Sequence, residues 1–193
     1  MLEKTLAKVG YALITETADK IEYGDIIWFK STEAGGREIS ASPNGETNTI
    51  YADGLPVIQA TDNAGYDITL QLLAIIDDVE TDWFGKKQLA DGTILEIGDV
   101  SENPRFALVA AKELFANAKK YAIDTYFYCS ASERPSKKSK TSEGKFDPEF
   151  PEISIAAAPR PDNKFVCTTV YADTLPTSIT VPTLTAAASS ESE

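Results

Sequence analysis

Histidine is absent from this 193-residue chain, and cysteine occurs only twice, at Cys129 and Cys167. Without histidine, the usual general base of nucleophilic catalysis is missing, and two cysteines cannot make a zinc site without further ligands. Both cysteines lie in apolar, strand-like runs, which favours two small buried side chains over a disulfide. We therefore expect no enzymatic activity and no metal or other cofactor.

Long apolar runs are missing too. None approaches the roughly 20 residues that a membrane-spanning helix needs, and the residues after Met1 lack the apolar segment of a signal peptide.

Positive charge is scarce as well, because 18 Lys and Arg stand against 30 Asp and Glu, a net charge of −12. Such a balance disfavours a nucleic-acid-binding surface, which needs basic side chains against phosphates. It suits a soluble protein made in a cytoplasm, or a surface that repels DNA.

Three groups of residues could in principle carry catalysis, metal binding or ligand binding. The acidic cluster Asp77, Asp78, Glu80 and Asp82 fails the calcium-loop pattern, since Trp83 and Leu89 stand where glycine and glutamate are required; a helix cap explains it better. A Ser–Lys pair within 136–139 falls in a polar loop, where lysine stays charged and inactive as a base. The aromatic residues Tyr121, Tyr126, Phe127 and Tyr128 favour a strand with one face in the core and the other in an interface, over a ligand platform.

Turn signals and alternating apolar residues predict an antiparallel β fold. Gly35-Gly36, Asn44-Gly45, Asp53-Gly54 and Asp91-Gly92 separate short β-rich runs. In Tyr66–Ile76, Ile68, Leu70 and Leu72 alternate with polar residues, as in a half-buried strand. The expected strands are Gly10–Thr15, Asp25–Lys30, Arg37–Ser42, Thr47–Ala52, Val57–Thr61, Tyr66–Ile76, Thr93–Ile97, Phe106–Phe115, Tyr121–Cys129, Glu152–Ala158 and Lys164–Tyr171.

One short helix is expected over Asp78–Phe84, capped by Asp77 or Asp78 and ended by Gly85 in the left-handed conformation. The segment Asn103–Lys120 gives two conflicting signals. Its alanines, its Asn-Pro start and its terminal lysines are helical, whereas it leads without a strong break into the β-rich Tyr121–Cys129. We predict a β-hairpin with its turn near Asn117-Ala118, because intrinsic propensity is a weak guide that tertiary context overrides.

The segment Glu133–Lys145 is a polar loop with five basic and two acidic residues. Its net charge of +3 leaves −15 on the rest of the chain. Such a composition cannot bury a core. We predict a single domain over residues 1–182, with the polar loop 133–147 inserted and a polar tail over 183–193. The basic residues of the loop are candidates for contacts between subunits: Arg134, Lys137, Lys138, Lys140 and Lys145.

The order of the segments along the chain is similar to that of a known protein family. The stretch Ile39–Gly54 brings two Thr/Ser-rich strands to an Asp-Gly turn, after an opening Val9–Thr15 and a Tyr23-Gly24 turn. A long strand and short helix follow over Asn63–Gly85, then a paired unit over Phe106–Cys129, a polar loop and two closing strands. Over about Val9–Val170 this order resembles the major tail proteins of long-tailed, non-contractile bacteriophages, the siphophage type. The chain differs by its Asn117-Ala118 turn, where such proteins often have Asn-Gly, and by its long basic loop.

The resemblance implies a mainly β, antiparallel sandwich- or barrel-like tail-tube fold with one short flanking helix. It implies a structural virion protein without catalysis, assembled in the bacterial host cytoplasm and located in the virion tail. Its partners would be copies of itself in stacked hexameric rings, the tape-measure protein and the tail terminator, with DNA only in transit and no membrane. The alternatives are a ligand- or carbohydrate-binding β-sandwich module, or another virion component such as a tail terminator or decoration protein.

Overall fold

The computed structural model describes residues 2–17, 20–45, 47–52, 55–61, 63–98, 103–115, 117–133 and 148–183. Within them the chain forms strands and one short helix, so the predicted mainly β fold is confirmed. The elements in chain order are β1 (Glu3–Glu16), β2 (Ile21–Tyr23), β3 (Ile27–Trp28), β4 (Gly36–Asn44), β5 (Thr47–Ala52), β6 (Leu55–Thr61), β7 (Gly65–Leu72), α1 (Asp77–Asp82), β8 (Lys87–Gln88), β9 (Ile94–Leu95), β10 (Phe106–Leu114), β11 (Tyr121–Ala131), β12 (Glu152–Ala157) and β13 (Cys167–Ala172).

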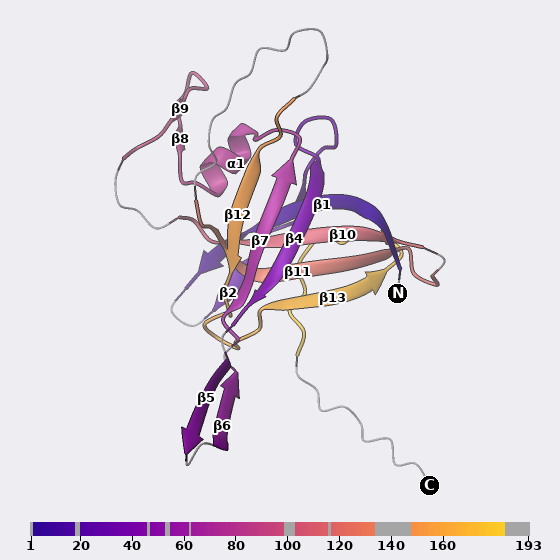
Figure 1. The fold of residues 1–193 in the computed structure, drawn as a ribbon. Helices are drawn as coiled ribbons and strands as arrows, with labels where there is room; N and C mark the ends of the chain where they lie inside the picture. Colours follow the sequence, from indigo (N-terminus) through magenta and orange to yellow (C-terminus); the bar gives the residue numbers. More distant parts are fainter. Residues whose placement is uncertain are drawn as a thin grey trace.

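Two layers of antiparallel strands cross each other in a sandwich-like arrangement (Figure 1). The first layer holds β2 and β3 on one side of β1, followed by β10, β11 and β13. The second holds β12, β7 and β4. The described strands follow an open path from β2 to β4 and do not close into a barrel.

Strand β11 belongs to both layers. Its first half, Tyr121–Tyr126, pairs with β13, whereas its last residues, Cys129–Ala131, pair with β12. A register irregularity in the pairing with β10 falls between Phe106 and Leu108, beside this change of partner. Such irregularities bend strands and increase their twist, so β11 can leave one layer and enter the other.

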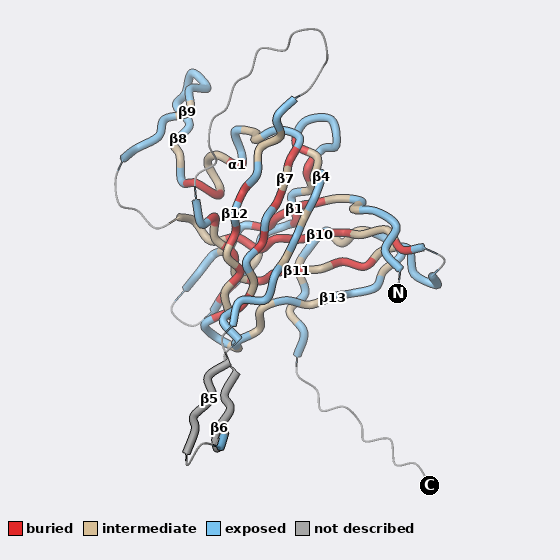
Figure 2. The backbone as a smooth tube through the Cα atoms, in the orientation of Figure 1, coloured by how far each residue is buried: buried red, intermediate tan, exposed pale blue. Residues whose placement is uncertain are grey.

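The main core lies between the layers. Figure 2 shows the buried stretches concentrated where the layers cross. On β7, Ile68, Leu70 and Leu72 are buried, while Asp67 and Thr69 on the other face are exposed, which confirms the predicted half-buried strand. The core continues through side chains of both layers and of α1: Val9, Tyr11, Phe29, Val79, Trp83, Phe106, Leu108, Ile153 and Ile155.

A second, smaller cluster covers the opposite face of the first layer. Ile26, Val109, Ala111 and Ile123 pack there, with Trp28 and the segment after β13 against them. The indole Nε1 of Trp28 donates to the Pro176 carbonyl at 3.0 Å, which fastens that segment.

Both faces of β10 are therefore covered, and Phe106–Ala111 are all buried. A strand buried on both faces loses alternation and reads as a continuous apolar run. This explains the ambiguous sequence signal, and the predicted hairpin is confirmed: β10 and β11 pair directly. Near its turn, the Ala118 amide donates to the Asn117 side-chain oxygen at 2.6 Å.

Helix α1 was predicted in the right place, but its cap was wrong. The N-cap is Ile76, in an extended conformation and without a side-chain cap hydrogen bond, so neither Asp77 nor Asp78 caps it. Both acidic residues lie in the first turn, where the helix dipole favours negative charge. The predicted end is confirmed, since Gly85 has φ +65° and donates to the Thr81 carbonyl at 3.1 Å.

Candidate functional site

The predicted contact residues Arg134, Lys137, Lys138, Lys140 and Lys145 lie outside the described residues, as do Ser136 and Ser139. The strands that flank their loop are described. β11 ends at Ala131 and β12 begins at Glu152, and the Ser132 amide donates to the Ser154 carbonyl at 2.8 Å. In the chain, the loop therefore connects two strands that pair with each other.

Two long strand edges are open in the described part of the chain. β13 pairs only with β11, and β4 pairs only with β7. On β13, Val170 and Tyr171 are about half exposed. Unpaired edges offer backbone donors and acceptors to another chain.

Strands β5 and β6 form a hairpin, here called the arm, that extends away from both layers (Figure 1). Within the described residues its strands pair only with each other, in register from Thr47 with Thr61 to Ala52 with Leu55. The arm is joined to the body where β4 and β7 make their last pair, Asn44 with Gly65. A two-stranded hairpin is at best marginally stable in water, so a partner that covered the arm would stabilise it.

A second projection carries exposed apolar side chains. β8 and β9 form a short hairpin beyond α1, on which Leu89, Leu95 and Ile97 are exposed. Its base is held by Lys86, whose ammonium is nearly buried and pairs with Glu80 at 3.0 Å and Glu96 at 3.3 Å. This ion pairing ties the hairpin to the helix.

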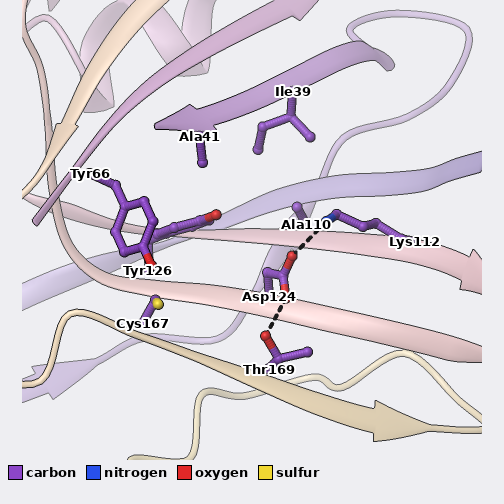
Figure 3. Close-up of a pocket in the computed structure, with 9 residues that line it drawn as sticks. All are labelled: Ile39, Ala41, Tyr66, Ala110, Lys112, Asp124, Tyr126, Cys167 and Thr169. Carbon is purple, nitrogen blue, oxygen red and sulfur yellow. Dashed lines mark hydrogen bonds and ion pairs between the residues drawn. The ribbon is translucent and has the colours of Figure 1, made fainter. Parts of the chain in front are cut away.

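A cleft of about 220 Å³ opens between the layers. Figure 3 shows the residues that line its two walls. Ile39 and Ala41 on β4 and Tyr66 on β7 form one wall, which faces side chains of β10, β11 and β13. The lining on these three strands is Ala110, Lys112, Asp124, Tyr126, Cys167 and Thr169. The cleft therefore lies between the two open edges, β4 and β13.

Asp124 is the centre of a polar network in the cleft. Its Oδ2 pairs with the Lys112 ammonium at 2.9 Å, and its Oδ1 accepts from the Thr169 hydroxyl at 2.6 Å. Lys112 also bonds Glu3 at 3.0 Å. Burial alone would lower the pKa of Lys112, but the hydrogen bonds that its ammonium donates to Asp124 and Glu3 outweigh burial and raise that pKa. The ammonium therefore stays charged.

Two tyrosines join the layers across the cleft. The rings of Tyr66 and Tyr126 meet edge to face, with centroids 5.7 Å apart. Desolvation is the main cause that raises the pKa of Tyr126. For Tyr66, the neighbouring Cys167 is the main cause of a raised pKa. Both hydroxyls therefore stay protonated and able to donate. The aromatic run was predicted to have one face in the core and the other in an interface. Phe127 is fully buried, and Tyr126 also reaches the cleft.

The cysteines differ from the prediction in one respect. Cys129 is buried as expected, but Cys167 is exposed at the cleft. The prediction of two buried cysteines is therefore wrong for Cys167, because β13 is an edge strand and offers less cover. Both thiols are free, so the preference against a disulfide is confirmed.

Two acidic residues of α1 make contacts that hold the helix against its neighbours. Asp82 accepts a hydrogen bond from the Tyr11 hydroxyl at 2.6 Å, and Glu80 holds Lys86. No group of three potential metal ligands occurs among the residues that the structure describes. In the same residues, no helix combines the length and apolar character needed to cross a membrane.

A comparison of the chain with models of known protein families and with curated proteins finds no match.

Proposed function

We propose that the chain is a structural subunit that assembles with copies of itself into stacked rings, forming the tail tube of a long-tailed, non-contractile bacteriophage. The resemblance in segment order suggests this class. The observation that carries the proposal is the arm: two strands that pair with each other, Thr47–Ala52 and Leu55–Thr61, extend from the body without a further described partner strand. A monomer gains little from such an arm, whereas a neighbouring subunit can cover it.

The open edges support the same proposal. β4 is the edge strand of the second layer and β13 is an edge strand of the first, and each can accept a strand from a neighbour. Closure of such edges between subunits protects polar strands from uncontrolled pairing. The exposed β8–β9 hairpin adds a further apolar contact surface, through Leu89, Leu95 and Ile97.

Charge is consistent with a conduit for DNA. At −12 per chain, a wall of such subunits repels phosphates within about a Debye length, ~8–10 Å at physiological salt. A basic wall would instead bind DNA through counterion release and slow its passage. In this proposal the tape-measure protein and the tail terminator are the further partners, and the loop lysines contact the next ring.

The test is assembly of the purified full-length chain at high concentration, followed by negative-stain electron microscopy and light scattering. Stacked rings are the expected result. A strictly monomeric particle under all conditions would overturn the proposal. Single rings that never stack would favour a tail terminator, and binding to capsids by unassembled protein would favour a decoration protein.

An arm-deletion variant makes the test specific. Removal of residues 46–62 joins Gly45 to Asn63 and leaves a three-residue loop between the paired Asn44 and Gly65, a common hairpin length. We expect this variant to keep the far-UV circular dichroism and melting temperature of the body and to lose assembly. Tubes of normal length from the variant would show that the arm is not the contact.

A further inference from the structure

The cleft between the layers contains hydrogen-bond donors and acceptors that are not all satisfied by contacts within the fold. A carboxylate has about four acceptor positions, and on Asp124 the bonds from Lys112 and Thr169 hold the group in place while leaving acceptor positions free. In the described part of the chain, nothing hydrogen-bonds the hydroxyl of Tyr126, which lines the same cleft. An acceptor and a donor therefore face the same space (Figure 3).

The opposite wall is mainly apolar and aromatic. Ile39 and Ala41 present aliphatic carbon, and the Tyr66 ring is held edge to face with Tyr126. A volume of about 220 Å³ equals roughly seven water molecules at the liquid volume of ~30 Å³ each. The cleft thus fits a compact ligand with one apolar face and one hydrogen-bonding edge.

The net charge of the polar network further limits the class of ligand that the cleft can bind. Lys112 is neutralised by both Asp124 and Glu3, so the network carries one excess negative charge in a chain of net charge −12. An anion is therefore disfavoured. An apolar guest would take water away from the free acceptor positions of Asp124 and from the Tyr126 hydroxyl without replacing its hydrogen bonds, which is costly. A cation would have to compete with the Lys112 ammonium for Asp124.

We propose that this cleft binds a small neutral polyhydroxylated molecule, with a single sugar ring as the best fit. One face of the ring packs on Ile39, Ala41 and Tyr66. Its hydroxyl groups donate to Asp124 and accept from Tyr126. The site requires only the two layers of one chain, so its binding is separate from assembly through the arm.

Saturation-transfer NMR and calorimetry on the full chain would test this, with D-glucose, D-galactose and N-acetyl-D-glucosamine as probes. We expect at least one sugar to bind with a dissociation constant of about 1–10 mM, a free energy of only ~3–4 kcal/mol. The Tyr126→Phe variant keeps the ring and removes the hydroxyl, and should weaken binding about 5-fold. The matched control is Tyr171→Phe, which removes a hydroxyl from β13 outside the cleft lining, and should bind as the wild type does.

The two thiols give an independent readout. Cys167 is exposed at the cleft, whereas Cys129 is fully buried and desolvation raises its pKa to about 12. A bound sugar should slow alkylation of Cys167, with Cys129 unreactive in both states. The proposal is overturned if none of the three sugars binds, if Tyr126→Phe binds them as tightly as wild type, or if a saturating sugar leaves Cys167 alkylation unchanged. Preferential binding of tetramethylammonium or benzoate over the sugars would overturn it as well.

Discussion

The indole of Trp83 lies flat on the ring of Phe106, with centroids 4.2 Å apart and planes 7° from parallel. Trp83 follows the last helical residue of α1 and Phe106 is the first residue of β10, so this contact fixes the helix to the first layer. Tyr11 of β1 meets the same indole edge-on at 5.5 Å, and its hydroxyl donates to Asp82 on the helix. Helix α1 is thus positioned by an aromatic cluster and by the hydrogen bond from Tyr11 to Asp82.

Replacement of Trp83 by Ala should lower the free energy of unfolding by about 3–5 kcal/mol, because it opens a cavity in the core. Trp83→Phe should cost less than Trp83→Ala. It retains an aromatic ring against Phe106, and it removes an indole N–H that is buried without a hydrogen-bond partner among the described residues. Urea unfolding followed by circular dichroism measures both. Equal losses in the two variants would contradict the role given to the stacked ring.

Gly65, at the start of β7, should tolerate no side chain. Its φ is +114°, and a Cβ would lie 1.9 Å from the Ala157 carbonyl oxygen on the neighbouring strand. We expect Gly65→Ala to destabilise the protein by about 2–6 kcal/mol, the sum of backbone strain and overpacking. The control is Gly92→Ala, where φ is +85° but nothing lies within 4 Å of the added atom; it should cost only about 1–2 kcal/mol. Similar melting temperatures for the two variants would refute this account.

Alkaline pH should unfold the protein through its buried tyrosines. Burial is the main cause that raises the pKa of Tyr23 to about 12, and it also raises the pKa of Tyr11 and Tyr126. Because these pKa values are raised on folding, their contribution is fully present below the unfolded value of about 10 and is lost as pH rises through the folded values. The melting temperature should therefore fall from about pH 10 to 12, while the tyrosinate absorbance rises over the same range. Tyr23→Phe should make that fall shallower, and an unchanged fall would argue against Tyr23 as a contributor.

The positions of many strands along the chain could be predicted, because β7 and the β5–β6 arm carry local signals. Alternation marks Ile68, Leu70 and Leu72, and turn residues bound Thr47–Ala52. β2 and β8 were missed, since strands of three and two residues are too short for any period. β7 ends at Leu72 rather than at Ile76, because the chain turns there toward α1.

The cleft could not be predicted. Lys112, Asp124 and Thr169 are brought together by the registers of three strands, and nothing near any one of them in the sequence marks a partner. Tyr66 and Tyr126 meet only because the layers cross. Local periodicity predicts which face of a strand is buried, but it carries no information on which polar residue faces which across a sheet.

The basic loop gives a prediction that depends on the proposed tube. Six copies of a chain at −12 carry −72, so stacked rings repel each other unless complementary charges meet at the junction. The loop supplies such charges through Lys137, Lys138 and Lys140. Exposed ion pairs are worth only ~0–1 kcal/mol each, but repetition around a ring multiplies them.

Changing Lys137, Lys138 and Lys140 together to Glu should leave the melting temperature unchanged and shorten the tubes. The matched control changes the same three residues to Arg, which keeps the charge and should preserve tube growth. Tube length is measured by electron microscopy at increasing salt. Because salt screens charge–charge attraction over about a Debye length, wild-type tubes should shorten as salt rises, whereas the Glu variant should respond less. If the Glu variant grows tubes of wild-type length with wild-type salt sensitivity, the loop lysines do not hold the rings together.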